Sequence, residues 1–212
     1  MYIKSKYPLR WKLQYIPSYY DGLNEEQQRD QKVILNFKNG LYDDNLMSWF
    51  RQNIWKMAKE HEYSWSICFL PCSSDEEQKK RFTKLANYLS EKMKIETHLS
   101  TFGYEEKPEI VHHVDKSNID MMNIALYVPD IYMKNVILID DIITTGETFN
   151  KTAEQAMRMG AHSVHGLFLA KTVHPDLPMK EKQTSNQEDL EAIIREEAEI
   201  MNKLSNLPPE AN

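Results

Sequence analysis

The stretch of sequence that most restricts the fold is "NVILIDDIITTGETF", residues 135–149. Its apolar run, residues 136–139, predicts a strand buried on both faces, as is typical of a parallel sheet. Two acids, Asp140 and Asp141, follow at once, and Gly146 then stands at the start of a predicted helix. A strand, a glycine turn and a helix in this order indicate an α/β unit whose polar residues gather at the carboxyl end of the strand.

The rest of the chain alternates predicted strands and helices. Strands are predicted at 65–70, 123–128, 135–139 and 163–173, and helices at 25–40, 43–61, 75–94, 145–160 and 187–204. This order predicts an α/β fold with a mainly parallel, doubly wound sheet and helices on both faces. Residues 101–122 are polar and lack periodicity, so we expect a lid or binding loop there. We expect the last helix to dock on the domain or on a second copy of the chain in a homodimer.

The charge and the cysteine content exclude several classes of protein. The chain carries 26 Lys and Arg against 32 Asp and Glu, a net charge of −6, which gives no strong signal for nucleic-acid binding. Cys68 and Cys72 have no second pair with which to form a zinc site. Neither a signal peptide nor a membrane-spanning run is recognisable, so we expect no membrane association and a soluble, cytoplasmic protein.

The residues after the predicted strand suit a sugar phosphate. The start of a helix presents free N–H groups and the positive end of its dipole, which together favour an anion. Thr144, Thr145 and Thr148 add hydroxyl donors. The two acids repel a phosphate but accept hydrogen bonds from sugar hydroxyls. Glu147 opposes an anion unless its carboxylate faces solvent, which is the orientation we expect.

The string "VILIDDIITTGET" resembles the signature of the type I phosphoribosyltransferases. Within that family the sequence is most similar to the ComF-like, competence-associated branch, whose order is followed by "FKNG", "KKRFTKLANYL", "NIAL" and "GAHSVHGLFLAKT". The resemblance covers about residues 36–173. It implies a phosphoribosyltransferase core over 36–173, a variable N-terminal hood or extension over 1–35, and a linker with a C-terminal amphipathic helix over 174–212.

The resemblance also implies a substrate and a set of residues that bind it. Asp140 and Asp141 would be the catalytic acids: they would hold the ribose hydroxyls of phosphoribosyl pyrophosphate (PRPP) and contact Mg²⁺. The loop after them would hold the 5′-phosphate, "PCSS" would be a pyrophosphate loop, and residues 101–122 a catalytic loop. The other implied PRPP-binding residues are Thr144, Thr145, Gly146, Glu147, Thr148, Cys72, Ser73, Ser74, Lys107 and His113.

The sequence departs from the family pattern in ways that bear on the substrate. An N-terminal cysteine zinc module, common in the ComF-like branch, is not recognisable in the sequence. Asp120 stands where that branch often has Arg, and Glu147 where Ala or Gly is usual. Thr144 occupies the place of an Asp that serves the base in 6-oxopurine enzymes, which argues against hypoxanthine or guanine. The resemblance thus predicts transfer of a phosphoribosyl group from PRPP to an unidentified nitrogen acceptor, with release of pyrophosphate.

Several alternatives stay open at this point. Either acid alone could be a helix N-cap, and Ser73 or Ser74 could simply cap the next helix. The acids together with Lys171 could form a receiver-like phosphoryl site. A protein of this kind could also bind PRPP or a nucleotide as a regulatory sensor without catalysis, because a fold does not determine a function.

Overall fold

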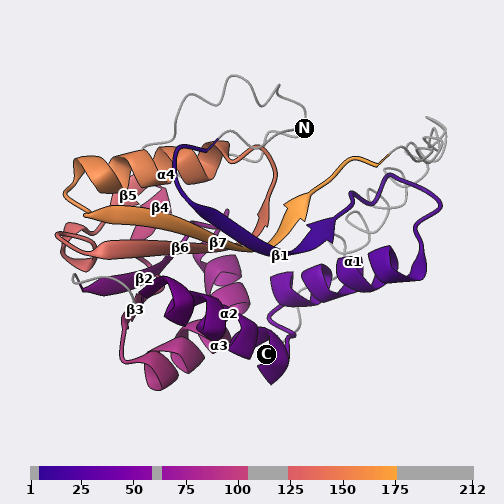
Figure 1. The fold of residues 1–212 in the computed structure, drawn as a ribbon, viewed down its shortest axis with the longest axis horizontal. Helices are drawn as coiled ribbons and strands as arrows, with labels where there is room; N and C mark the ends of the chain where they lie inside the picture. Colours follow the sequence, from indigo (N-terminus) through magenta and orange to yellow (C-terminus); the bar gives the residue numbers. More distant parts are fainter. Residues whose placement is uncertain (1–4, 59–63, 105–123, 176–212) are drawn as a thin grey trace, which may run out of the picture.

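The computed structural model describes residues 5–58, 64–104 and 124–175, which form a five-stranded sheet in the order β1-β7-β6-β2-β3 (Figure 1). The strands are β1 (Leu9–Tyr15), β2 (Trp65–Phe69), β3 (Glu96–His98), β6 (Asn135–Ile143) and β7 (Ser163–Thr172). Every pairing within this sheet is parallel, so the predicted parallel α/β fold is confirmed. The carboxyl ends of all its strands therefore meet at one edge.

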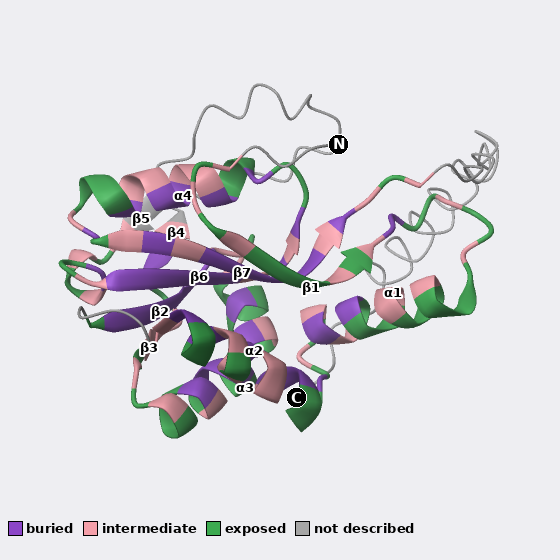
Figure 2. Ribbon diagram, in the orientation of Figure 1, coloured by how far each residue is buried: buried purple, intermediate pink, exposed green. Residues whose placement is uncertain are grey.

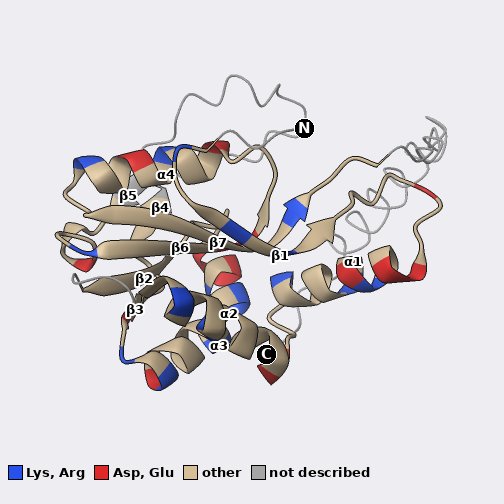
Figure 3. Ribbon diagram, viewed as in Figure 1, with Lys and Arg blue, Asp and Glu red and all other residues tan. Residues whose placement is uncertain are grey.

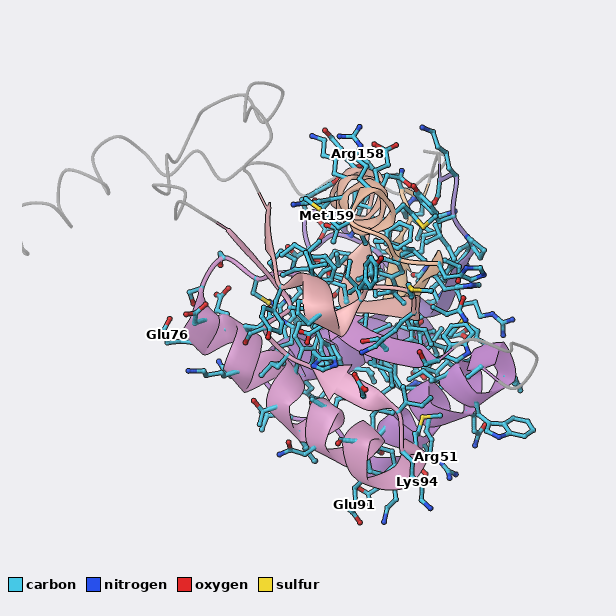
Figure 4. All side chains as sticks on the ribbon, turned by 90° about the vertical axis from the view of Figure 1, so that its left-hand side faces the viewer. Arg51, Glu76, Glu91, Lys94, Arg158 and Met159 are labelled. Atoms are coloured by element: carbon cyan, nitrogen blue, oxygen red, sulfur yellow. The ribbon has the colours of Figure 1, made fainter. Side chains whose placement is uncertain are left out.

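Helices cover both faces of the sheet, as predicted. Three of them lie on one face: α1 (Glu25–Lys38), α2 (Asp44–Ala58) and α3 (Asp75–Met93). The fourth, α4 (Glu147–Arg158), lies on the other face. Figure 4 looks along α4, with Arg158 and Met159 at its near end, and shows α3 running from Glu76 to Glu91 on the opposite side of the sheet.

Local sequence explains why the helices begin where they do. Asn24 and Gln27 form a reciprocal capping box at the start of α1. The hydroxyl of Ser74 accepts a hydrogen bond from the backbone N–H of Glu77 and so caps α3. Inward-facing apolar residues recur at helical spacing along α3, which gives it a buried stripe against the sheet.

Two apolar layers hold the central strand β6 in place (Figure 2). Ile137 and Ile139 pack into the layer between the sheet and α1–α3, whereas Val136 and Leu138 pack into the layer beneath α4. All four side chains are fully buried, and burial of each aliphatic side chain is worth about 1.5–3 kcal/mol. The strand is thus anchored on both faces, and its carboxyl end is presented at a fixed position.

The N-terminal segment contributes a strand and a helix to the domain. Residues 9–15 form the edge strand β1, which pairs with β7, and the expected boundary at residue 35 falls inside α1. Leu9, Trp11, Leu13 and Tyr15 alternate with polar residues, a pattern that suits an edge strand. Trp11 is 42% exposed, and the Lys171 ammonium lies 5.1 Å from the centroid of its ring.

A short ribbon lies outside the main sheet. β4 (Phe102–Tyr104) pairs antiparallel with β5 (Ile124–Leu126), and a 3₁₀ turn, η2 (Val128–Asp130), follows β5. Residues 105–122 of the expected loop, and the C-terminal helix expected at 187–204, lie outside the described residues. Among the helices that are described, none has the length and apolarity needed to cross a membrane.

Candidate functional site

The candidate site lies where the carboxyl ends of β2 and β6 meet. The backbone N–H of Leu70 donates to the carbonyl of Ile139 at 3.0 Å, which holds the two strand ends together. Beside them is a cavity of about 230 Å³ between β6 and the start of α4. The predicted residues that line it are Asp140, Thr144, Thr145, Gly146, Glu147 and Thr148. The structure therefore brings the acid and the whole predicted turn to one hollow.

Gly146 forms the turn that starts α4. Its φ of 82° and ψ of 8° lie in the left-handed region, which glycine adopts without steric cost. Gly146 is itself the N-cap residue and has no side chain that could cap the helix. Neither Asp140 nor Asp141 occupies the cap position, so the alternative in which they are caps of this helix is wrong. The positive end of the α4 dipole borders the cavity.

Two of the hydroxyls around this turn have partners within the protein. Thr145 Oγ1 accepts from the backbone N–H of Glu147 at 3.3 Å, so its own O–H is left to donate elsewhere. The hydroxyl of Thr144 pairs with that of Thr172, at the end of β7, at 2.8 Å. Glu147 points to solvent: its side chain is 67% exposed and its carboxylate lies 2.6 Å from Lys151 Nζ. The predicted orientation of Glu147 is confirmed, and Lys151, which does not line the cavity, partly offsets its charge.

The two acids have different surroundings. The Asp140 side chain is 22% exposed and lines the cavity, whereas the Asp141 side chain is 6% exposed and does not line it. Burial, and then the neighbouring Asp141 carboxylate, raises the pKa of Asp140 well above its ordinary value, and Arg81 opposes this rise. A carboxyl with so perturbed a pKa at the rim of a cavity is a feature of functional sites.

Two basic residues that the sequence analysis missed hold Asp141. Arg81 Nη1, from α3, lies 3.1 Å from Asp141 Oδ2 and 3.8 Å from Asp140 Oδ1. Lys38 Nζ, from the last turn of α1, lies 3.4 Å from the same Asp141 Oδ2. The sequence did carry a signal for Arg81, because at helical spacing it shares the inward face of α3 with Phe82 and Leu85. In Figure 3 most of the charged residues lie on the helices rather than in the interior of the sheet.

A second cavity, of about 260 Å³, lies next to the first and shares Pro71 with it. Cys72, Ser73 and Ser74 line it, together with Lys79, a cation that the sequence analysis did not single out. The backbone N–H of Cys72 donates to Gln78 Oε1 at 2.8 Å, and the Ser73 hydroxyl donates to Glu77. Ser74 caps α3, which agrees with the alternative that Ser73 or Ser74 serves as a helix cap.

The expected catalytic loop and metal site are described only in part. Lys107 and His113 lie outside the described residues. Within the residues that are described, no cluster of three or more His, Cys, Asp and Glu side chains could enclose a metal ion. The Asp140 carboxylate at the cavity rim fits Mg²⁺ instead in the way this ion usually binds, through one or two carboxylates and the substrate phosphates.

The receiver-like alternative finds little support in this geometry. Lys171 lies over the ring of Trp11 at the edge of the sheet, 5.1 Å from its centroid, and is absent from the lining of both cavities described here. The hollows instead offer N–H and O–H donors beside a carboxylate, an arrangement that suits a phosphorylated sugar.

Comparison with known proteins shows a similarity among solved structures. No protein-family model matches the sequence, and no curated protein matches it. Among solved structures, the chain is similar to a hypoxanthine phosphoribosyltransferase from Staphylococcus aureus, with 13% sequence identity over 76% of this chain and 92% of that chain. The TM-score is 0.34, so this similarity is too loose to assign a family or a site.

Proposed function

We propose that this protein binds PRPP and transfers its phosphoribosyl group to a nitrogen acceptor, with release of pyrophosphate. One observation carries the proposal: two cavities meet at Pro71, one bordered by an acid and by a helix start whose N-cap residue has no side chain, the other by the start of α3 and Lys79. PRPP has the matching order of groups, a phosphate at one end, a diphosphate at the other and a sugar between them. The motif resemblance of residues 136–148 to type I phosphoribosyltransferases supports the same assignment.

In this proposal the protein positions the reactants and supplies charge. The lone pair of the acceptor nitrogen forms a bond to ribose C1, the bond from C1 to the pyrophosphate oxygen breaks, and pyrophosphate leaves with the electron pair. A proton from the acceptor passes to solvent or to a base. Asp140 accepts a hydrogen bond from a ribose hydroxyl, and the turn at residues 144–148 holds the 5′-phosphate. Mg²⁺, held by the acid and the phosphates, would offset the charge of the leaving group.

A second candidate function is a PRPP or nucleotide sensor without catalysis. It is favoured by the second cavity, where the Cys72 N–H and the Ser73 hydroxyl already donate within the protein. Fewer donors then remain for a leaving pyrophosphate. The two candidates differ in turnover and not in the site that binds the ligand.

The experiment that separates them measures pyrophosphate release from PRPP and Mg²⁺ across a panel of nucleobases and amines, with PRPP binding measured in parallel. Release with one acceptor supports the enzyme, whereas binding without release supports the sensor. Asp140→Asn should weaken both signals. Glu91→Gln, at the exposed far end of α3, is the matched control and should lose neither (Figure 4). Absence of PRPP binding by the parent protein would reject both candidates.

A further inference from the structure

Arg81 is a mostly buried cation with two carboxylates in reach. Its side chain is 15% exposed, and its Nη1 lies 3.1 Å from Asp141 Oδ2 and 3.8 Å from Asp140 Oδ1. A guanidinium keeps its charge at any ordinary pH, so an arginine at this depth requires a carboxylate partner. The nearer of its two partners is Asp141.

The turn of α3 that carries Arg81 is held from outside the helix. The Tyr42 hydroxyl donates to the carbonyl of Arg81 at 2.9 Å and accepts from the backbone N–H of Leu85 at 3.0 Å. Gly40 approaches the same turn so closely that an added Cβ would lie 2.3 Å from the carbonyl oxygen of Lys80. The connection between α1 and α2 therefore fixes the backbone around Arg81, which in turn restricts where its guanidinium can lie.

The same contacts treat the two acids unequally. Asp141 has Arg81 at 3.1 Å and Lys38 at 3.4 Å, and both cations come from helices on the face of the sheet opposite α4. Asp140 has a single, longer cation contact, to Arg81, its Oδ1 accepts from the backbone N–H of Asp141 at 2.7 Å, and it lines the cavity at the start of α4. The pair thus combines one carboxylate engaged inside the protein with one directed at the ligand cavity.

We propose that Arg81 is a positioning residue that, with Lys38, holds Asp141 in an internal ion pair, so that Asp140 is the principal carboxylate for the ligand's sugar hydroxyls. This inference rests on the proposed function and makes it more specific. It assigns unequal roles to two acids that the motif alone would treat as equivalent. Arg81 acts through the acids and does not touch the ligand.

The test compares PRPP affinity, measured by titration calorimetry with Mg²⁺, in four variants at a temperature where circular dichroism shows each one folded. Asp140→Asn should lose about tenfold or more, the size expected for one hydrogen bond to a charged group. Asp141→Asn should lose at least about fivefold less affinity than Asp140→Asn, while its melting temperature falls below that of the parent. Arg81→Met should weaken PRPP binding about tenfold but leave the affinity for inorganic phosphate nearly unchanged. Arg81→Lys keeps the positive charge and should therefore bind PRPP nearly as tightly as the parent. If Arg81 had only a structural role, Arg81→Lys would not need to bind PRPP more tightly than Arg81→Met.

Each contrary result has a distinct meaning. Equal losses in Asp140→Asn and Asp141→Asn would overturn the division of roles while leaving PRPP binding intact. Parent-like PRPP affinity in Arg81→Met would overturn the positioning role, and so would equal losses in Arg81→Met and Arg81→Lys. If Arg81→Met does not fold, the comparison of Arg81→Lys with the two Asp variants decides. A parent protein that does not bind PRPP would instead reject the proposed function, and this inference with it.

Discussion

Substitution of Gly146 by valine tests whether the turn before α4 is the phosphate site. At a φ of 82° a β-branched residue is strained, and left-handed backbone costs a residue with a Cβ about 1–2 kcal/mol. For a protein of 150–250 residues, each kcal/mol lowers the melting temperature by about 2–4 °C. We therefore expect Gly146→Val to melt about 4–8 °C below the parent if it costs about 2 kcal/mol.

Gly22 provides a matched control for that strain. Its φ is 73°, and an added Cβ would meet no atom within 4 Å. Gly22→Val should therefore show a similar loss of stability, but it lies outside both cavities. The difference between the two variants in ligand binding then reports on the turn itself rather than on backbone strain.

The assay is thermal denaturation with and without PRPP at about one hundred times its dissociation constant. Binding at that concentration stabilises the folded state by about 2.7 kcal/mol, which corresponds to a rise of about 5–11 °C. The parent and Gly22→Val should show this rise, Gly146→Val should show none, and Thr145→Val should show a reduced one. An equal rise in Gly146→Val and Gly22→Val would refute the assignment of the phosphate to this turn.

Three further predictions concern the surroundings of the site. Tyr42→Phe should lower the free energy of unfolding, measured by chemical denaturation, by about 1–3 kcal/mol, because the N–H of Leu85 loses a buried partner. An unchanged denaturation midpoint would show that the Tyr42 hydroxyl does not contribute to stability. Burial raises the pKa of Cys72 to about 12, so at pH 8 iodoacetamide should modify this thiol in the native protein about thirtyfold more slowly than it modifies an ordinary thiol. Cys72→Ala should abolish the slow reaction, and labelling at the rate of a free thiol would contradict the prediction. The raised pKa of Asp140 means that its ionised form destabilises the folded state, so Asp140→Asn should melt at a higher temperature than the parent at pH 7.5. The difference in melting temperature should shrink as the pH falls towards 4, and a difference that does not change with pH would contradict this explanation.

The sequence predicted the centre of the fold because the signals there are local. The apolar run of β6, the glycine before α4 and the amphipathic pattern of α3 each depend on neighbouring residues alone. Each burial or cap contributes to the element that carries it, so periodicity and turn chemistry suffice to predict it. The solvent-facing orientation of Glu147 was predictable for a similar reason, since Lys151 lies one helical turn away.

What the sequence did not predict depends on contacts between distant segments. The alternating residues of β1 were visible, but their place beside β7 arises from a backbone ladder between the two ends of the described chain. Arg81 and Lys38 lie on inward faces of α3 and α1, yet nothing local indicates that both reach Asp141. The unequal surroundings of Asp140 and Asp141 follow from those two helices. They cannot be predicted from a motif in which the two residues are adjacent and identical.

The central claim is that a phosphorylated ribose binds between Asp140 and the turn that starts α4. The most direct test is a titration of isotopically labelled protein with ribose 5-phosphate, followed by the backbone amide resonances in NMR spectra. The largest shifts should fall on the amides of residues 144–149 and on Asp140, and they should be absent from the same titration of Gly146→Val. Shifts that cluster elsewhere in the molecule, or saturating binding that leaves these amides unmoved, would contradict the claim.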